Sequence, residues 1–346
     1  MSQQEHILVL RISALGDVAM LVPVLREVFK TYPDVKITLL SRAKMQPLFE
    51  EFKAVEFFPF DPKKHKGLVG LWKLFFALKK QHIMAVADLH YVLRSRVLSL
   101  FFICFGIKVK HLNKNRRGRR ELINTEKKDI KPLGSVHNCY AQVFNNLGYP
   151  IDLSQHQFSK RPTKKSKAII EGFKVEKRKW IGIAPFAAHL GKRYPLDLMQ
   201  KVVCYLQQEH DVFLLGRGIE EEKQLMLWAA AYKNAHSITN LSFNRQLKLI
   251  AHLDVMLSMD SANGHIAANY NIPVITLWGM THPYAGFKPF NQPDENQITL
   301  NRNRYPKIPT SIYGNKIPQG YEEAFRSIAP KEIIEKVLWV LTSKET

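Results

Sequence analysis

The sequence predicts an α/β protein of two domains, each with a parallel sheet that carries helices on both faces. In both halves of the chain, apolar stretches of strand length alternate with stretches long enough for helices. An acidic turn also follows a strand-like stretch twice, at Asp17 and at Asp260. Ligands of open α/β sheets bind where strands pass into helices. We therefore expect two facing domains with a reaction in the cleft between them.

Composition supports two globular domains and points to an anionic partner. The chain has 346 residues and is 46% hydrophobic, which is enough for two cores. Its net charge of +21 comes from 51 Lys and Arg against 30 Asp and Glu. Such an excess predicts a polyanionic partner. Nucleic acid, anionic lipid and phosphorylated small molecules all fit the charge alone.

Cysteine spacing and hydropathy favour a cytoplasmic protein without a membrane span. Cys104, Cys139 and Cys204 are far apart, so neither a disulfide framework nor a cysteine zinc site is indicated. The first residues lack the basic and apolar regions of a signal peptide. The longest apolar run, residues 97–107, is far shorter than the roughly 20 residues that a spanning helix needs.

The elements of the first half follow from hydrophobic periodicity. Strands are expected at residues 6–12, 36–40, 55–60, 83–89 and 107–111, with crossover helices between them. A helix over residues 18–32 has Leu21, Leu25 and Val28 on one side. Pro23 is expected to tighten or bend this helix.

The second half repeats the pattern after a polar, basic stretch at residues 151–178, which indicates the interdomain linker. Strands are expected at residues 180–186, 212–215, 255–259 and 273–278, and helices at 196–209, 219–232, 245–253 and 330–343. The predicted organisation is a first domain at 1–165, a linker at 166–178, a second domain at 179–329 and a terminal helix at 330–346.

Asp17 follows Gly16 at the start of the first helix, and two interpretations are open. An acidic residue there stabilises the positive helix end by about 0.5–2 kcal/mol. Alternatively, Asp17 is a general base in the cleft, where Gly16 lets a substrate approach the backbone closely. A carboxylate at a helix start is a weak base at rest, and closure of an apolar cleft over it would strengthen it.

The second turn and the loop before it are candidates for binding a phosphate. The turn consists of Asp260, Ser261, Ala262, Asn263, Gly264 and His265. It reads either as a simple helix cap or as a helix start with free N–H groups suited to a phosphate. His265 either donates to the same anion or is a satisfied buried histidine. Thr281 adds a hydroxyl after the next strand. Lys192 and Arg193 can neutralise a pyrophosphate, unless they are solvated surface residues.

A basic segment at residues 108–131 is a candidate contact for anionic lipid headgroups or a phosphorylated glycolipid, at roughly 1 kcal/mol per residue. Its ten basic residues are Lys108, Lys110, Lys114, Arg116, Arg117, Arg119, Arg120, Lys127, Lys128 and Lys131. Nucleic acid is the rival ligand. The segment has no interleaved aromatics and the chain no helix-turn-helix or zinc-finger spacing, so nucleic acid is not expected.

Several motifs are absent from the sequence. It contains no G-x-x-x-x-G-K-[ST], G-x-S-x-G or H-E-x-x-H. The Gly216-Arg217-Gly218 turn lacks the third glycine of a dinucleotide fingerprint. No D-x-D occurs, so a metal that carries a sugar nucleotide is not supported. Neither a metal nor an organic cofactor is expected.

Residues 7–11 with the Gly16-Asp17 turn resemble the opening of glycosyltransferase family 9, the ADP-heptose:lipopolysaccharide heptosyltransferases. The order Asp260-Ser261, His265 and then 279–283 is similar to the donor-site signature of that family. The resemblance covers residues 5–290. Two departures are Ala262, where the signature has glycine, and Ala187-Ala188, where hydroxyl residues precede the lysine. They leave that phosphate contact to backbone N–H groups or His189.

The resemblance implies two facing Rossmann-like domains of the GT-B type, the first for acceptor and the second for nucleotide sugar. It also implies inverting, metal-independent transfer and a final helix that can pack back on the first domain. Asp17 would be the base, Lys192 the pyrophosphate contact, Asp260 the partner of sugar hydroxyls and Glu220 a ribose contact.

The predicted function is transfer of heptose, or a related sugar, from a nucleotide sugar such as ADP-heptose to a lipopolysaccharide-core or related glycolipid, peripherally on the inner face of the cytoplasmic membrane. The predicted donor-binding residues are Lys192, Arg193, Glu220, Asp260, Ser261, Asn263, Gly264, His265 and Thr281. The predicted acceptor-binding residues are Ser13, Gly16, Arg116, Arg117, Arg119 and Arg120. The alternatives are a non-catalytic protein that binds polyanions or a membrane surface, and a nucleotide-sugar epimerase on the same fold.

Overall fold

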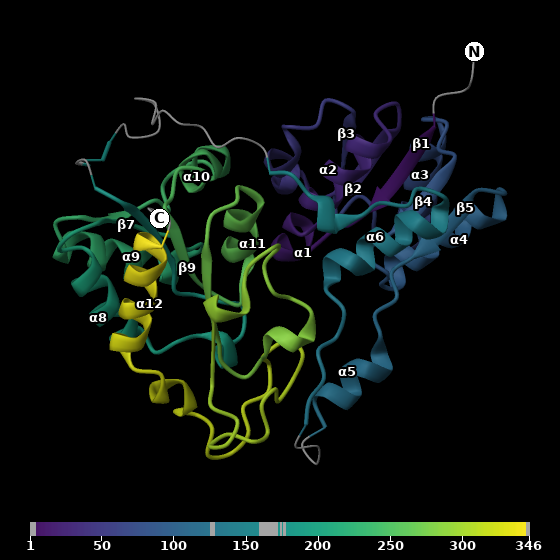
Figure 1. Cartoon of the computed structure of the whole chain (residues 1–346). Helices are drawn as coiled ribbons and strands as arrows, with labels where there is room; N and C mark the ends of the chain where they lie inside the picture. The colour runs from purple at the N-terminus through teal and green to yellow at the C-terminus, as the bar shows by residue number, and fades with distance from the viewer. Residues whose placement is uncertain (1–4, 125–128, 159–171, 174, 176–177, 344–346) are drawn as a thin grey trace. The chain divides into compact units, whose positions relative to one another are not determined.

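The computed structural model describes residues 5–124, 129–158, 172–173, 175 and 178–343. The chain divides into two compact units. Unit 1 comprises residues 1–114 and 136–157, and unit 2 comprises residues 115–135 and 158–346 (Figure 1). Most of the predicted linker, with its basic residues 161–165, lies outside the described residues.

Unit 1 is built on one parallel sheet. Its described strands are β1 (His6–Leu10), β2 (Lys36–Ser41), β3 (Val55–Pro59), β4 (Ala85–Asp88) and β5 (Lys108–His111). They lie in the order β3-β2-β1-β4-β5, and every pair is parallel. The five strands expected from the sequence are therefore confirmed. The strand order reverses between β1 and β4, which places the ligand-binding edge of this unit there.

The first helical stretch is broken in two. The sequence predicts one helix over residues 18–32, but the structure has α1 (Leu15–Ala19) and α2 (Leu21–Thr31). Pro23 explains the break because it has no N–H to donate to the carbonyl of Ala19 and its ring would meet that carbonyl. In α2, Pro23 stands in the first turn, where its missing N–H costs nothing.

Helices cover both faces of this sheet (Figure 1). On one face α3 (Gly67–Lys79) and α4 (Leu93–Cys104) bury residues such as Leu74 and Phe102 against alternate β1 residues, Leu8 and Leu10. On the other, α2 packs against α6 (Val136–Leu147). Two 3₁₀ helices, η1 (Ala43–Phe49) and η2 (Leu153–Gln155), join these elements.

Unit 2 repeats the plan with a larger parallel sheet. Its described strands are β6 (Trp180–Ala184), β7 (Asp211–Leu214), β8 (Ala235–Ser237), β9 (Val255–Met259), β10 (Val274–Trp278) and β11 (Gln297–Thr299). Their order is β11-β10-β9-β6-β7-β8, and all pairs are parallel. The order reverses between β6 and β9. The edge strands β8 and β11 were not predicted because each has only three residues.

The helices of unit 2 surround that sheet. They are α8 (Leu196–Leu206), α9 (Ile219–Ala231), α10 (Phe243–Ile250), α11 (Ala262–Asn269) and α12 (Pro330–Thr342), with 3₁₀ turns η3 (Leu190–Lys192), η4 (Pro283–Ala285), η5 (Asp294–Asn296) and η6 (Ala324–Ser327). For the terminal helix α12, the resemblance implied only that it can pack back on the first domain. It packs on α8 and β9 of unit 2 (Figure 1), because Ile333 and Val337 are fully buried in the core of this unit.

The segment between β5 and α6 packs on unit 2, although the predicted boundary places it in the first domain. Its helix α5 (Arg116–Leu122) buries Leu122 against Ala285 and Ile312. Further along, the N–H of Leu133 donates to the carbonyl of Tyr284 at 2.8 Å. None of the helices in the described part of the chain is long and apolar enough to cross a membrane.

Candidate active site

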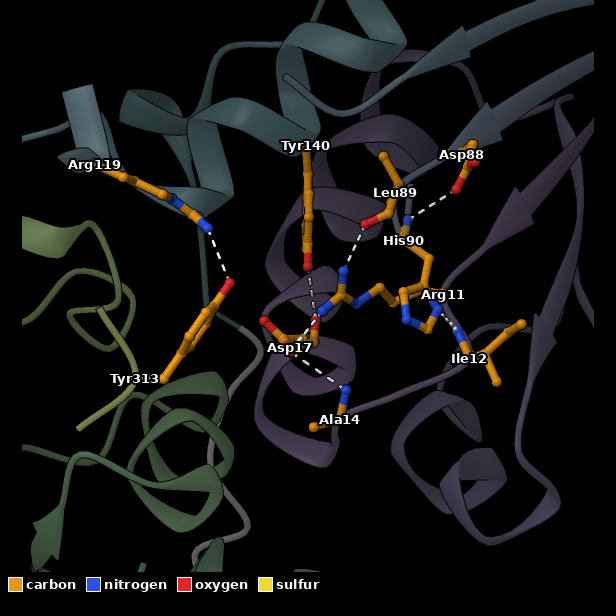
Figure 2. Close-up of polar contacts among 10 residues, drawn as sticks. All are labelled: Arg11, Ile12, Ala14, Asp17, Asp88, Leu89, His90, Arg119, Tyr140 and Tyr313. Carbon is orange, nitrogen blue, oxygen red and sulfur yellow. Dashed lines mark hydrogen bonds and ion pairs between the residues drawn. The ribbon is translucent and has the colours of Figure 1, made fainter. Parts of the chain in front are cut away.

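The candidate site in unit 1 lies where β1 and β4 end, at the reversal of strand order. Asp17 stands in the third position of α1, and its carboxylate contacts the Arg11 guanidinium at 2.5 Å. The same carboxylate accepts the backbone N–H of Ala14 at 3.3 Å. Asp17 is thus both a helix-start acid and an ion-pair partner, and 26% of its side chain stays exposed (Figure 2).

Arg11 is held tightly under this turn. It is buried, and a guanidinium nitrogen donates to the carbonyl of Leu89 at 2.6 Å. The guanidinium also lies over the ring of Tyr140, 5.7 Å from its centroid. The Tyr140 hydroxyl donates to the backbone carbonyl of Asp17 at 3.2 Å (Figure 2). Arg11 and Tyr140 therefore fix the position of Asp17 from beneath, while Ser13 and Gly16 line the half-buried turn beside it.

The loop after β4 adds two titratable groups to this edge. Asp88 is buried and accepts the backbone N–H groups of His90 and Tyr91 at 3.0 and 2.7 Å. Burial raises the pKa of Asp88. Burial first, and then the charge of Arg11, lower the pKa of His90 to about 4. Neutral His90 accepts the Ile12 N–H at Nδ1, 3.2 Å away.

The site residues predicted from the sequence did not include Arg11, Asp88, His90 or Tyr140. Asp88 and His90 could have been found from the sequence, because both stand at the end of a predicted strand. In the sheet this strand pairs with β1, which precedes Asp17. Tyr140 carried no such signal, since it lies within helix α6 and not at a strand end.

The candidate site in unit 2 also lies at the reversal of strand order. Lys192 comes from the loop after β6 and Asp260 from the turn after β9. The Lys192 ammonium lies 2.7 Å from an Asp260 carboxylate oxygen, and the Thr281 hydroxyl donates to the same oxygen at 3.0 Å. Asp260 and Thr281 are buried, and only 14% of the Lys192 side chain is exposed. Residues far apart in sequence thus form one charged group.

Three glycines let the loops around this group pack closely. A Cβ on Gly279 would overlap the carbonyl oxygen of Gly191, and a Cβ on Gly191 would lie 2.5 Å from the carbonyl oxygen of Gly314. Gly314 has φ +71°, and a Cβ there would lie 2.5 Å from Cγ of Lys192. The Lys192 side chain therefore occupies space that is open because Gly314 has no Cβ. We did not predict from the sequence that the loop of residues 308–316, which contains Gly314, lies beside Lys192.

The start of α11 was predicted to bind a phosphate. Ser261 is its N-cap residue with no side-chain bond to the helix backbone. The Ser261 hydroxyl lies 3.1 Å from that of Ser258. Gly264 and His265 are buried, and Asn263 is half-buried. The first N–H groups of α11 thus have no cap from the Ser261 side chain, which favours the anion-binding interpretation.

The other predicted donor residues lie nearby or at the surface. Arg193 donates to the carbonyl of Ala187 at 2.6 Å and lies 3.9 Å from Glu221. Glu221 accepts the Arg217 N–H at 2.9 Å, so its side chain closes the turn before α9. Glu220 is 87% exposed and pairs with Lys223 at 3.3 Å.

The predicted acceptor arginines all lie on α5, in unit 2. Arg119 donates to the Tyr313 hydroxyl at 3.1 Å (Figure 2) and stacks over the ring of Phe287. Arg117 pairs with Glu121, and Arg120 donates to the carbonyl of Arg116. Arg119 therefore holds a protein contact, whereas Arg116, Arg117 and Arg120 are exposed. Lys127 and Lys128 lie outside the described residues.

The model of glycosyltransferase family 9 (heptosyltransferase) matches residues 71–316. The chain belongs to this family. The match includes His90, Lys192, Asp260 and Thr281, and Asp17 precedes it.

Two curated relatives of this family 9 chain are themselves heptosyltransferases. Lipopolysaccharide core heptosyltransferase OpsX from Haemophilus influenzae is 24% identical over 287 residues, with 80% of this chain and 79% of the relative covered. Lipopolysaccharide heptosyltransferase 3 from Escherichia coli is 26% identical over 309 residues, with 85% and 87% covered.

Solved structures share the fold of the family 9 chain. A family 9 glycosyl transferase from Veillonella parvula superposes with a TM-score of 0.75 at 17% identity, covering 99% of both chains. The E. coli ADP-heptose LPS heptosyltransferase II gives 0.70 at 20% identity, covering 99% of this chain and all of the other. E. coli heptosyltransferase WaaC with ADP-2-deoxy-2-fluoro heptose gives 0.62 at 14% identity, covering 96% and 99%. The predicted GT-B fold, two parallel sheets with helices, is confirmed.

Within each unit of the family 9 chain, the structure brings some predicted residues together and leaves others apart. Lys192, Asp260 and Thr281 form one group, and Ser261 begins the helix beside it. Glu220 and the exposed α5 arginines belong to no such group. Among the described residues, no three His, Cys, Asp or Glu side chains are grouped to hold a metal ion.

Proposed function

We propose that this family 9 chain transfers a heptose from ADP-heptose to a lipopolysaccharide-core glycolipid, with inversion at the anomeric carbon and without a metal. The activities named for its relatives and structural neighbours support the donor and acceptor classes. Family membership favours transfer over an epimerase or a non-catalytic polyanion-binding protein. The single observation that carries the mechanism is the fixed Arg11–Asp17 pair at the strand-order reversal of unit 1.

The donor is proposed to bind at the carboxyl edge of the unit 2 sheet. A nucleoside diphosphate carries negative charge that grows as the sugar leaves, and fixed positive groups stabilise it. Lys192 and the uncapped N–H groups of α11 supply them. Because Lys192 is paired with Asp260 at 2.7 Å, the pair is close to neutral. The helix N–H groups therefore supply the excess attraction for the pyrophosphate.

Asp260 has a second task in this proposal. Its carboxylate oxygen Oδ2 holds Lys192 and Thr281, and a carboxylate has a second oxygen that can accept hydrogen bonds. We propose that Oδ1 accepts from hydroxyls of the transferred sugar. Asp260 then orients the sugar and the lysine together.

Asp17 is proposed to take the proton of the acceptor hydroxyl. A hydroxyl is a poor nucleophile until its proton is removed as attack proceeds. The oxygen of the acceptor forms its bond to the anomeric carbon while the bond to the diphosphate breaks, so one displacement inverts that centre. Asp17 receives the proton, and the Arg11 guanidinium keeps the carboxylate turned toward the acceptor edge.

The test is the variant Asp17→Asn, which keeps the size of the side chain and removes its basicity. Transfer of heptose to acceptor should fall by about 10³-fold or more, while calorimetric titration with ADP should give an unchanged affinity. Near-normal turnover in Asp17→Asn would exclude Asp17 as the base. The matched control is Asp34→Asn, which neutralises an exposed carboxylate of unit 1 away from this turn and should leave transfer near the native rate.

A further inference from the structure

The outer face of α3 and α4 in unit 1 exposes an unusual number of large apolar side chains. Their exposed fractions run from 41% for Trp72 and Phe76 to 79% for Leu93. The full set is Leu68, Val69, Trp72, Phe76, Leu93, Leu100, Ile103 and Phe105. We call this set the α3/α4 face. Large exposed apolar patches on a soluble domain commonly mark a site of interaction.

Aromatic contacts join Trp72, Phe76 and Phe105 of this set into one continuous surface. The ring of Trp72 on α3 lies 4.9 Å from that of Phe76 and 4.8 Å from that of Phe101 on α4. Phe105, at the end of α4, is 6.4 Å from Phe76. The two helices pack side by side (Figure 1). The exposed aromatic residues are therefore neighbours on one face. Leu68 and Val69 stand four and three residues before Trp72 on α3, so helical spacing places them on the same side of that helix.

The same part of the chain is almost entirely basic. Between Pro62 and Lys114 the only acidic residue is Asp88, and Asp88 is fully buried. The basic residues of this stretch are Lys63, Lys64, Lys66, Lys73, Lys79, Lys80, Arg94, Arg96, Lys108, Lys110 and Lys114. Several of them interleave with the apolar residues, and the Lys79 ammonium lies 3.8 Å from the centroid of the Phe105 ring.

The α3/α4 face begins at the edge that carries Asp17. In a parallel sheet each crossover helix starts at the carboxyl ends of the strands. Leu68 and Val69 stand at the start of α3, and Leu93 is the first residue of α4. These three residues therefore lie toward the same edge of the unit 1 sheet as Asp17, and the face extends away from it along the helices.

We propose that the α3/α4 face docks unit 1 on the surface of an anionic lipid bilayer. Apolar and aromatic side chains enter between the headgroups while lysine and arginine pair with lipid phosphates. A second copy of the chain fits less well, because the cores of protein interfaces are depleted of lysine. This surface goes beyond the proposed reaction, which does not say where the enzyme meets the membrane. It also differs from the basic segment 108–131 predicted from the sequence, since its apolar residues lie on α3 and α4.

The first test is sedimentation of the full chain with vesicles. Vesicles of phosphatidylglycerol and phosphatidylethanolamine should pellet the protein, and phosphatidylcholine vesicles should bind it about tenfold less. The variant Leu68→Glu/Val69→Glu should bind the anionic vesicles at least about tenfold less than the native chain. The matched control is Met226→Glu/Leu227→Glu on α9, where an adjacent pair is 62% and 65% exposed. This control should bind as the native chain does.

A second readout does not depend on a variant that carries new charges. Trp72 and Trp339 are both exposed, at 41% and 51%, and lie in different units. Vesicles with brominated acyl chains should quench the native fluorescence. The quenching should be lost in Trp72→Phe and kept in Trp339→Phe. Quenching that persists in Trp72→Phe would overturn the proposal.

Three further outcomes would overturn it. One is equal binding to anionic and phosphatidylcholine vesicles, and another is binding that survives Leu68→Glu/Val69→Glu. The third is a dimer in light scattering that Leu93→Glu dissociates, which would make the α3/α4 face an interface between copies. Vesicle binding needs no turnover, so its failure is distinguishable from failure of the proposed reaction, which is measured with a detergent-free, truncated soluble acceptor.

Discussion

The Arg11 guanidinium bridges the Asp17 carboxylate, at 2.5 Å, and the Leu89 carbonyl, at 2.6 Å. One side chain therefore ties the turn after β1 to the end of β4. A planar guanidinium can hold two acceptors in fixed directions, whereas an ammonium on a flexible stem cannot do so with the same geometry.

We expect Arg11→Lys to reduce kcat by about tenfold or more, because Asp17 would lose its fixed direction. ADP affinity, which we propose is a property of unit 2, should not change. The measurements are transfer rates at saturating donor and a calorimetric ADP titration. A parallel loss of ADP affinity would contradict this assignment. Arg26→Lys, in a partly buried pair with Glu51 away from this turn, is a matched control and should leave both values unchanged.

We propose both a structural and a functional role for the Lys192–Asp260 pair, and two variants separate them. Lys192→Met leaves the buried Asp260 without its cation, which should lower the free energy of unfolding by roughly 2–3 kcal/mol. It should also weaken ADP binding. Lys192→Met/Asp260→Asn should recover much of the stability without recovering transfer. Thermal unfolding and ADP titration of both variants are the measurements, and restored transfer in the double variant would limit Lys192 to a structural role.

His90 gives the stability of unit 1 a pH dependence. Its pKa, lowered to about 4 by burial and by Arg11, lies below the value of about 6.5 in an unfolded chain. Between these values the unfolded state binds more protons, so stability falls as the pH drops from 6.5 toward 4 and is unaffected by His90 above that window.

The variant His90→Asn keeps an acceptor near Nδ1 and removes the titration. We expect it to flatten the loss of stability between pH 7 and pH 4 by roughly 1–2 kcal/mol, after allowance for partial exposure. Denaturant unfolding across this pH range is the measurement. His82→Asn is the matched control, because His82 is exposed and its left-handed φ of 57° suits asparagine. An equally steep loss in His90→Asn would assign the dependence to other groups, such as buried His282, whose pKa burial also lowers to about 4.

Gly279 tests the close packing under Lys192. In Gly279→Ala the new methyl would overlap the Gly191 carbonyl and the Phe325 ring. We expect a loss of about 1–3 kcal/mol in stability and weaker ADP binding, since the loop that carries Lys192 must move. Gly134→Ala should be neutral because its Cβ would meet nothing within 4 Å. The measurement is the free energy of unfolding of Gly279→Ala and Gly134→Ala. Equal stability of the two variants would show that the loops around Lys192 can move apart without a loss of stability.

The alternation of strands and helices was predictable because continuous apolar runs of strand length alternate with longer stretches that have apolar residues at helical spacing. Residues 255–259 and 273–278 became β9 and β10 almost as expected. Short elements were not predictable in this way. The three residues of β8 are too few to show a period, and the packing of α5 on unit 2 depends on Leu122 meeting Ala285, which no local pattern encodes.

The candidate site was predictable where a residue stands at a strand end, as Asp17, Lys192 and Asp260 do. The sequence did not indicate how these residues are supported. Arg11 is inside a strand-like stretch, where a basic residue gives no signal of its ion pair. Gly314 lies in a loop whose φ of +71° and closeness to Lys192 come only from the tertiary fold.

The division of the chain has a consequence for engineering. Residues 115–135 leave unit 1, pack on unit 2 and are followed by residues 136–157 of unit 1, so the chain passes between the units three times. A hybrid of two relatives that is joined once, near residue 158, would take residues 115–135 from one parent. The surface of unit 2 on which they pack would come from the other parent. Leu122 and Leu133 would then meet a foreign Ala285 and Tyr284. Exchange of intact halves therefore requires three splice points, with 115–135 moved together with the C-terminal half.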